Sequence, residues 1–159
     1  MCIRDSPCTD RIEIAPMIEE VFTDLAPLAE KSGITLESTG DGIMTGSDTL
    51  IYRLLFNLTE NAIRYNRPNG KVRVAVSTEA NRLVIRVSDT GSGIPEQYRD
   101  SIFQPFFRVD KSRSRELGGV GLGLALVHEI VRVHDGSICI KSGKTGGTIF
   151  EVTFAQCSI

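Results

Sequence analysis

The chain has 159 residues, enough for one domain of ordinary size with a continuous hydrophobic core. Its 20 acidic and 18 basic side chains nearly balance, so no basic field indicates nucleic-acid binding. No run approaches the roughly 20 apolar residues of a membrane-spanning helix, so we expect a soluble domain without direct membrane contact. The 4 cysteines form no C-x-x-C pair, which favours a reduced, cytoplasmic compartment.

The chain begins with a segment that shows no hydrophobic period. We expect residues 1–8 to be unstructured or artefactual, and residues 9–159 to form the domain. Apolar residues at helical spacing predict a first helix over 15–31. Pro27 is expected to kink or break this helix, and Gly33 to end it.

A strand, a turn and a second helix are predicted next. The alternation in residues 34–38 predicts the strand, and the glycine-rich residues 39–46 predict the turn. Ser47 or Asp48 can cap the second helix, which is expected to run to about Tyr65.

Two segments with period-two alternation follow, at residues 71–77 and 81–89. The short polar segment 78–80 between them fits a hairpin. The positions expected to face the core are Val72, Val74 and Val76.

The second half of the chain mixes a long loop with regular elements. Residues 101–121 are aromatic at one end and charged in the middle, which is typical of a lid-like loop. A third helix is predicted over 121–136, followed by strands over 137–143 and 147–154. Helices and strands interleave without the regular alternation of a parallel sheet. We therefore predict an α+β fold, a two-layer α/β sandwich whose mixed sheet carries the helices on one face.

The second helix carries a polar stripe beside its apolar one. At about 100° per residue, Asn57, Asn61 and Arg64 fall within a stripe about 60° wide. An amide oxygen can ligate Mg²⁺, which usually takes its other oxygens from water and substrate phosphates. Asn61 is therefore a candidate metal ligand. The alternative is that both asparagines only decorate a solvated helix face.

Asp89 continues the core-facing positions of the strand before it, and two glycines follow it closely. Burying this carboxylate unpaired would cost several kcal/mol, so it needs a hydrogen-bond donor, and an adenine amino group is a suitable one. Gly91 and Gly93 would let the backbone approach a flat base closely. The alternative is an ordinary Asp-Gly turn.

Three glycines at two-residue spacing, Gly119, Gly121 and Gly123, stand where the third helix begins. Bare backbone N–H groups at a helix N-terminus can bind an anion. This pattern resembles the dinucleotide-binding fingerprint only superficially, because a long loop and not a strand precedes it. In that loop, Arg108 lies beside the aromatic residues and could reach a phosphate.

Taken in order, "NLTENAIRYN", "DTGSGIP", "IFQPFFRVD" and "GGVGLGLALV" resemble the N, G1, F and G2 boxes of the catalytic ATP-binding domain of sensor histidine kinases. The resemblance extends from about Thr9 to Phe154. The fold of that family is the Bergerat ATP-binding fold, which agrees with the sandwich predicted above.

The resemblance implies a role for each polar position. It implies that Asn61 holds Mg²⁺ against the ATP phosphates, with Asn57 and Arg64 nearby, and that Tyr65 packs by the adenine. Asp89 would accept from the adenine amino group. The implied catalytic residues are Asn57, Arg64 and Arg108.

The resemblance also implies a phosphate cradle beneath a lid over 103–118, with Thr148 near the phosphate side. The other implied nucleotide-binding residues are Gly91, Gly93, Ile94, Phe106, Arg108, Gly119, Gly121, Leu122, Gly123 and Leu124.

Asn57 distinguishes this chain from hydrolytic members of the superfamily, which carry a water-activating glutamate four residues before the magnesium asparagine. We therefore expect slow hydrolysis and transfer of the γ-phosphate to a histidine. That histidine would lie on a dimerisation and phosphoacceptor domain upstream in the parent protein, and a response regulator would be a further partner. The parent is either soluble or membrane-anchored. The alternatives are an anti-sigma-factor type serine kinase and a non-catalytic ATP-binding module.

Overall fold

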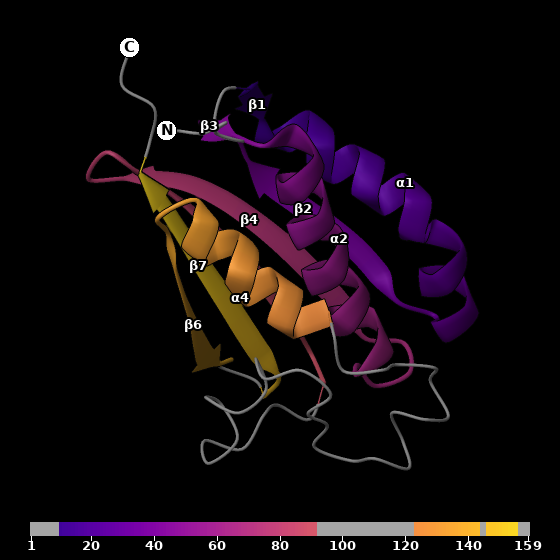
Figure 1. Ribbon diagram of the computed structural model, residues 1–159. Coiled ribbons are helices and arrows are strands. Elements are labelled where there is room, and N and C mark those ends of the chain that lie inside the picture. Colours follow the sequence, from indigo (N-terminus) through magenta and orange to yellow (C-terminus); the bar gives the residue numbers. More distant parts are fainter. Residues whose placement is uncertain (1–9, 92–122, 144–145, 156–159) are drawn as a thin grey trace.

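The computed structural model of the chain describes residues 10–91, 123–143 and 146–155. Five strands form one sheet, and their spatial order is β2 (Thr35–Gly40), β4 (Lys71–Glu79), β5 (Arg82–Asp89), β7 (Thr148–Ala155) and β6 (Ser137–Ser142) (Figure 1). The pair β2 and β4 is parallel, and the other neighbours are antiparallel. The predicted mixed sheet is therefore confirmed.

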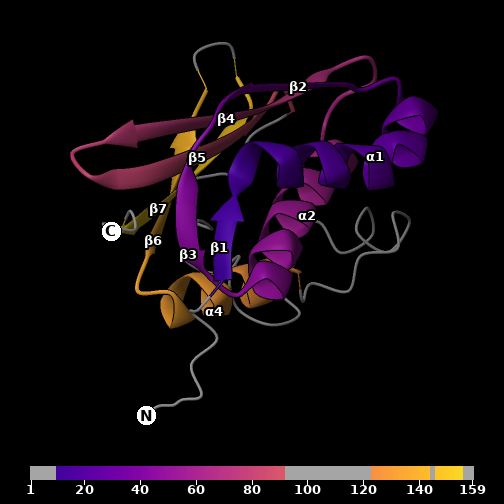
Figure 2. The ribbon, with the colours of Figure 1, turned by 90° about the horizontal axis from the view of Figure 1, so that it is seen from above.

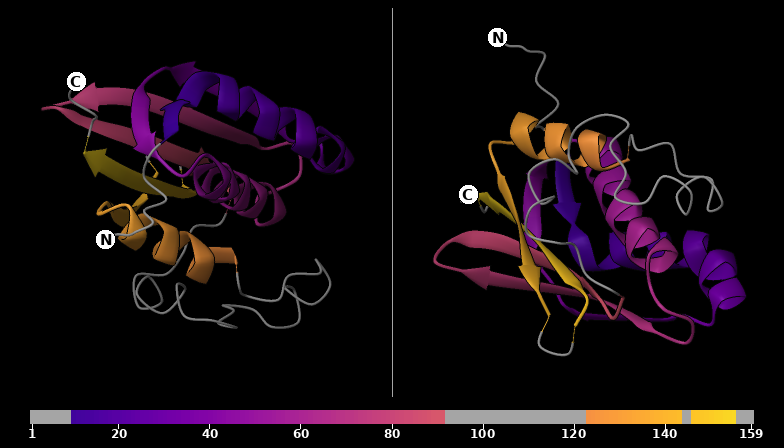
Figure 3. Two further views of the ribbon diagram at one scale, coloured as in Figure 1. Left: turned by 45° about the horizontal axis from the view of Figure 1, so that its top comes forward. Right: turned by 90° about the horizontal axis from the view of Figure 1, so that it is seen from below.

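The helices form the second layer. They are α1 (Ile14–Ser32), α2 (Asp48–Arg64) and α4 (Gly123–Val133), and they cover one face of the sheet (Figure 2). Contacts of α2 with both α1 and α4 place α2 between them (Figure 3). The opposite face of the sheet carries ion pairs such as Arg86 Nε to Glu151 Oε2 at 2.7 Å. The two-layer arrangement predicted from the sequence is confirmed.

The core lies between these layers and follows the two periodicities. In α1 the buried residues are Ile14, Met17, Ile18, Val21, Leu25 and Ala29. In α2 they include Ile51, Leu54, Leu55, Leu58, Ala62 and Ile63. The sheet contributes alternate residues, among them Val72, Val74, Val76, Leu83, Ile85 and Val87. Amphipathic helices over a sheet with one buried face account for the sandwich.

The first helix runs through Pro27 without ending, so the expected break there does not occur. It ends where predicted, because Gly33 takes a left-handed φ of 71° and its N–H donates to the carbonyl of Glu30 at 3.1 Å. The second helix starts as predicted, since the hydroxyl of Ser47 accepts from the N–H of Leu50 at 3.3 Å.

A small second sheet was not predicted. Strand β1 (Asp10–Glu13) pairs antiparallel with β3 (Ile43–Gly46), so the turn expected over 39–46 is wrong for its second half. Both strands have 4 residues, too few to show a clear period, and the buried Ile12 and Met44 are their main apolar contribution.

The hairpin between β4 and β5 is confirmed, but its turn is shifted from the predicted segment 78–80. Glu79 pairs with Arg82, so Ala80 and Asn81 alone form the turn. Their φ values of 51° and 63° fit a two-residue turn that matches the strand twist.

Candidate functional site

Four element ends meet at one end of the sandwich. They are the C-terminal half of α2, the end of β5, the start of β7 and the start of α4, at the lower edge of Figure 1. Polar residues of α2, β5 and β7 gather there beside the glycine that begins α4, and the described residues of the predicted site lie in or next to these four elements.

Asp89, the last residue of β5, has a carboxylate whose two oxygens differ in their hydrogen bonds to the described residues. Its Oδ1 accepts from the backbone N–H of Gly91 at 2.8 Å and of Thr148 at 3.3 Å. Its Oδ2 accepts no hydrogen bond from residues 10–91, 123–143 or 146–155. Burial raises the pKa of Asp89 above its ordinary value, and the two backbone N–H groups oppose part of that rise. One carboxylate oxygen is thus fixed by the fold, and the other has no partner within the described ranges.

Two glycines let neighbouring segments close around Asp89. A Cβ on Gly91 would lie 2.4 Å from the carbonyl oxygen of Tyr65, so the β5 end packs directly on the end of α2. A Cβ on Gly147 would lie 2.0 Å from the carbonyl oxygen of Asp89, and its φ of 84° is itself unfavourable for other residues. The carboxylate is therefore held by backbone on two sides.

A polar cluster beside Asp89 was missed in the sequence. Asn66 is 6% exposed, and its Oδ1 accepts from the Thr90 hydroxyl and from the Arg67 N–H, both at 2.8 Å. Its Nδ2 donates to the carbonyl of Lys71 at 3.0 Å. The Thr90 hydroxyl also accepts from the N–H of Lys71 at 3.0 Å. The only sequence signals were the position of Asn66 in a turn and of Thr90 directly after Asp89.

On α2, Asn57 and Asn61 are both partly buried. Neither side chain forms a hydrogen bond with another residue of the described ranges, so both amide oxygens can accept a ligand. Gly123, the first residue of α4, lies beside Asn57, because a Cβ there would be 3.8 Å from Asn57 Cγ. Arg64, one turn further along α2, pairs with Glu60 at 3.4 Å. The predicted polar stripe and the predicted anion-binding helix start therefore adjoin.

Thr148, at the start of β7, lies beside Asp89, because its N–H donates to the Asp89 carboxylate. Tyr65 caps the C-terminus of α2 next to Gly91, and Leu124 follows Gly123 in α4. The predicted residues that lie outside the described ranges are Gly93, Ile94, Phe106, Arg108, Gly119, Gly121 and Leu122, together with the predicted lid over 103–118.

The donor set fits a magnesium ion that a ligand brings with it. Among the described residues, no cluster of His, Cys, Asp and Glu could hold a metal by itself. The amide oxygen of Asn61, which has no partner there, is a hard neutral ligand, and Mg²⁺ typically binds through one or two protein oxygens, several waters and substrate phosphates.

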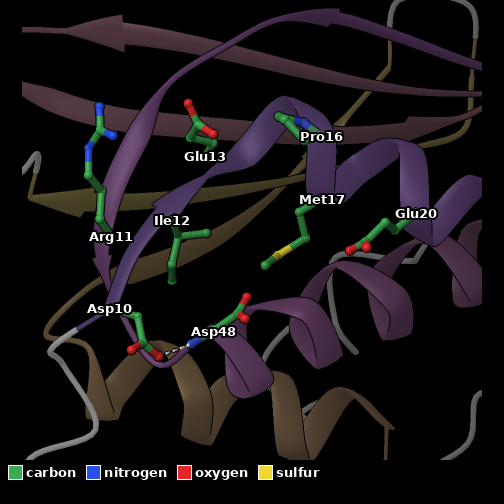
Figure 4. Close-up of a pocket in the computed structure, with 8 residues that line it drawn as sticks. All are labelled: Asp10, Arg11, Ile12, Glu13, Pro16, Met17, Glu20 and Asp48. Carbon is green, nitrogen blue, oxygen red and sulfur yellow. Dashed lines mark hydrogen bonds between the residues drawn. The ribbon is translucent and has the colours of Figure 1, made fainter.

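A hollow of about 600 Å³ lies elsewhere, at the N-terminal ends of α1 and α2 (Figure 4). Its lining residues are Asp10, Arg11, Ile12, Glu13, Pro16, Met17, Glu20 and Asp48. Asp48, its lining residue on α2, is the first residue of that helix, whereas Asn61 lies near the other end. The hollow shares no lining residue with the site around Asp89. The hollow therefore belongs to the other end of the sandwich.

Comparison with known proteins assigns the family. The family model described as histidine kinase-, DNA gyrase B-, and HSP90-like ATPase matches residues 46–157. The chain belongs to this ATPase family. Its matched range includes all four element ends that form the site, and membership implies that the domain uses ATP.

The similar curated proteins are sensor histidine kinases. The chain is 36% identical over 142 residues to the sensor histidine kinase RppB of Synechocystis. The aligned residues are 89% of this chain and 31% of that protein. It is 43% identical over 102 residues to the histidine-protein kinase ArlS of Staphylococcus aureus, covering 64% and 23% respectively. The chain thus spans less than a third of the length of these relatives.

Solved structures show the same fold. The nucleotide-free catalytic domain of histidine kinase ThkA has a TM-score of 0.79 and 26% identity, covering 92% of this chain and 96% of that one. The mycobacterial sensor histidine kinase MprB has a TM-score of 0.80 at 23% identity, and the match covers 95% of this chain and 99% of that one.

Within the described part of the chain, none of the helices has the length and hydrophobicity that a membrane span requires.

Proposed function

We propose that this ATPase-family chain is the catalytic domain of a sensor histidine kinase, which transfers the γ-phosphate of ATP to a histidine on a separate phosphoacceptor domain. The observation that carries the ATP site is the Asp89 carboxylate, with one oxygen held by two backbone N–H groups and the other without a partner among the described residues. ATP is abundant in the cytoplasm, so we propose that the domain acts there.

The base end of the site follows from the chemistry of Asp89. An ionised carboxylate only accepts hydrogen bonds, so Oδ2 selects a ligand that presents a donor, such as the exocyclic amino group of adenine. Gly91 keeps the space beside the carboxylate free of a side chain. Tyr65, at the end of α2, is proposed to pack against the same base.

The phosphate end is formed by α2 and α4. Asn61 is proposed to ligate Mg²⁺, and Mg²⁺ when bound neutralises charge on the phosphates. Gly123 places the N-terminal backbone of α4 beside Asn57, where a helix start attracts an anion. Arg64 and Arg108 are the cations proposed to stabilise the transferring phosphoryl group, together with Asn57. The remaining glycines that resemble the family motifs are proposed to line the triphosphate.

Transfer rather than hydrolysis is supported by Asn57 and by the relatives. An amide cannot act as a general base, so the position that would activate water in hydrolytic members is inert here. RppB and ArlS are named as histidine kinases. ThkA was solved in complex with its response regulator, and a response regulator is proposed as a partner of the parent protein here.

Calorimetry with MgATP and the 159-residue chain tests the binding site. We expect a dissociation constant in the micromolar-to-millimolar range. Titration without Mg²⁺ should weaken binding in wild type, and Asn61→Ala should remove most of that metal dependence. A metal dependence that is unchanged in Asn61→Ala would remove Asn61 from the metal site.

A further inference from the structure

Asn66 and Thr90 are joined by a hydrogen bond that connects two parts of the nucleotide site. Thr90 directly follows Asp89, and Asn66 directly follows Tyr65, the residue that caps α2. The Thr90 hydroxyl donates to Asn66 Oδ1 at 2.8 Å. This bond links the residue that follows β5, the strand of Asp89, to the turn that follows α2, the helix of Asn61.

Every side-chain polar atom of Asn66 and Thr90 has a hydrogen-bond partner. The Thr90 hydroxyl has a single hydrogen, which it gives to Asn66, and it accepts from the N–H of Lys71 at 3.0 Å. Asn66 donates to the Lys71 carbonyl at 3.0 Å and accepts from the Arg67 N–H at 2.8 Å. Asn66 is 6% exposed, so water cannot easily replace these partners. The cluster therefore fixes the rotamers of both side chains.

The surrounding packing leaves the cluster little freedom. A Cβ on Gly70 would lie 2.2 Å from Asn66 Oδ1 and 2.5 Å from Thr90 Oγ1, so the backbone closes over the bond. On the other side, a Cβ on Gly91 would lie 3.2 Å from the Cα of Asn66 and the same distance from Asp89 Oδ1. A shift of Thr90 must therefore move Asp89 and Gly91 with it.

We propose that Asn66 and Thr90 are positioning residues for base recognition: their hydrogen bond holds the Asp89 carboxylate at the place where it reads the 6-position of a purine. This inference rests on the proposed role of Asp89. Thr90 follows Asp89 in the chain and Asn66 is hydrogen-bonded to Thr90, so their loss is expected to change selectivity through the placement of Asp89.

The preference for ATP over ITP measures this placement. The two nucleotides differ at the purine 6-position, where ATP presents an amino donor and ITP a carbonyl acceptor. A variant that is only less stable should bind both nucleotides more weakly in the same proportion. A changed ATP-to-ITP affinity ratio therefore reports on the position of the Asp89 carboxylate. Thr90→Val keeps the shape of the side chain and removes the hydroxyl. We expect it to lower the ATP-to-ITP affinity ratio about tenfold, the factor that one hydrogen bond is worth.

The control variants separate placement from stability. Thr90→Ser retains the hydroxyl and should restore the wild-type ratio. Asp41→Ala, at the opposite end of the molecule, should lower the melting temperature and leave the ratio unchanged. Asn66→Ala removes the acceptor of the same bond and serves if Thr90→Val does not fold. The double variant should lose no more selectivity than either single one, because both act through one interaction.

The outcomes distinguish this inference from the proposed function. If Asp89→Asn keeps the wild-type ATP-to-ITP affinity ratio, Asp89 does not read the base. The proposed base-reading role of Asp89 and the positioning role of Asn66 and Thr90 are then both wrong. If Asp89→Asn loses the ratio while Thr90→Val and Asn66→Ala keep it, the base-reading role stands and the positioning role is overturned. Loss of the ratio in all three variants, with recovery in Thr90→Ser, is the result that we expect.

Discussion

The N–H of Thr148 donates to the carboxylate of Asp89 at 3.3 Å, across 59 residues of sequence. This contact joins the start of β7 to the end of β5 and fixes one oxygen of the carboxylate. Burial raises the pKa of Asp89 from its ordinary value of 3.8. The site therefore keeps a carboxylate in a place that disfavours its charge.

The first prediction concerns the effect of the Asp89 charge on folding stability. Because the pKa of Asp89 is higher in the folded protein than in the unfolded chain, its contribution to folding stability is fully present below the unfolded pKa and is lost as pH rises through the folded pKa. Asp89→Asn keeps an acceptor for Gly91 and Thr148 without the charge. The nucleotide-free variant should melt at a higher temperature than wild type at pH 7, and the two should converge below about pH 4.

The same variant should bind ATP about tenfold to a hundredfold more weakly, because a hydrogen bond to a charged group is lost and the amide NH₂ can face the adenine amino group. Calorimetry and thermal melting on one sample measure both effects. A variant that is both less stable and equally tight in binding would contradict this account of Asp89.

The second prediction concerns a helix cap supplied from a distant loop. The first helix has no side-chain cap of its own at Glu13. Asp41 Oδ1 instead accepts from the N–H of Ala15 at 3.1 Å and from that of Gly42 at 2.7 Å. Asp41→Ala should lower the free energy of unfolding by about 1 kcal/mol, the usual cost of losing such a cap.

Denaturant unfolding measures that loss, and Asp41→Asn is the matched variant, since its amide oxygen can still accept both bonds. Most of the stability should return in Asp41→Asn. Equal losses in the two variants would show that Asp41 does not act as a cap.

The third prediction concerns His134, which is 9% exposed at the end of α4. Its Nδ1 lies 2.8 Å from the carbonyl of Ile130, and its Nε2 accepts from the N–H of Ser47 at 3.0 Å. A carbonyl can only accept and a backbone N–H can only donate, so these two contacts match the tautomer with its proton on Nδ1. Nitrogen NMR of the ring should show this tautomer at neutral pH.

Replacing that ring should expose its role as a link between α4 and the start of α2. His134→Phe keeps the edge-on packing against Phe154 but leaves the Ser47 N–H without its acceptor. We expect a loss of about 1–3 kcal/mol in the free energy of unfolding. The exposed His128 on the same helix provides the comparison, and His128→Gln should stay within about 0.5 kcal/mol of wild type.

The sequence predicted the sandwich because its long elements carry clear periods. Helix α2 combines a cap at Ser47 with a regular apolar stripe, and β4 alternates from Lys71 to Ser77. The strands β1 and β3 were missed because 4 residues cannot display a period. Pro27 lies within α1 without ending it, since tertiary packing of the buried helix face outweighs the lost hydrogen bond.

The sequence predicts features of the candidate site that lie within one segment. It does not predict contacts that form between distant segments. The core-facing side of Asp89 followed from strand alternation, and Gly91 stands two residues after it. The contact of Thr148 with Asp89 depends on strand register, and the Asn66 to Thr90 bond depends on how the α2 end meets β5. Neither pairing leaves a pattern within a single segment.

The fourth prediction concerns Asn57, for which we propose the position that a glutamate takes in hydrolytic family members. Asn57→Glu would place a potential general base near the γ-phosphate. The variant should lose transfer to histidine, because an added charge beside the phosphates opposes binding and attack. A gain in hydrolysis requires the carboxylate to be positioned within about 1 Å, so loss of transfer is the stricter test. Asn57→Asp, whose shorter side chain places its charge differently, is the comparison.

Transfer to a supplied acceptor tests the central claim most directly. The chain is mixed with MgATP and a separately purified phosphoacceptor domain, and phosphohistidine and free phosphate are measured side by side. Our account predicts that phosphohistidine accumulates while phosphate release stays slow, and that a histidine-to-alanine acceptor remains unlabelled. Rapid release of phosphate with no labelling of any acceptor histidine would contradict the kinase assignment and identify the domain as a plain ATPase.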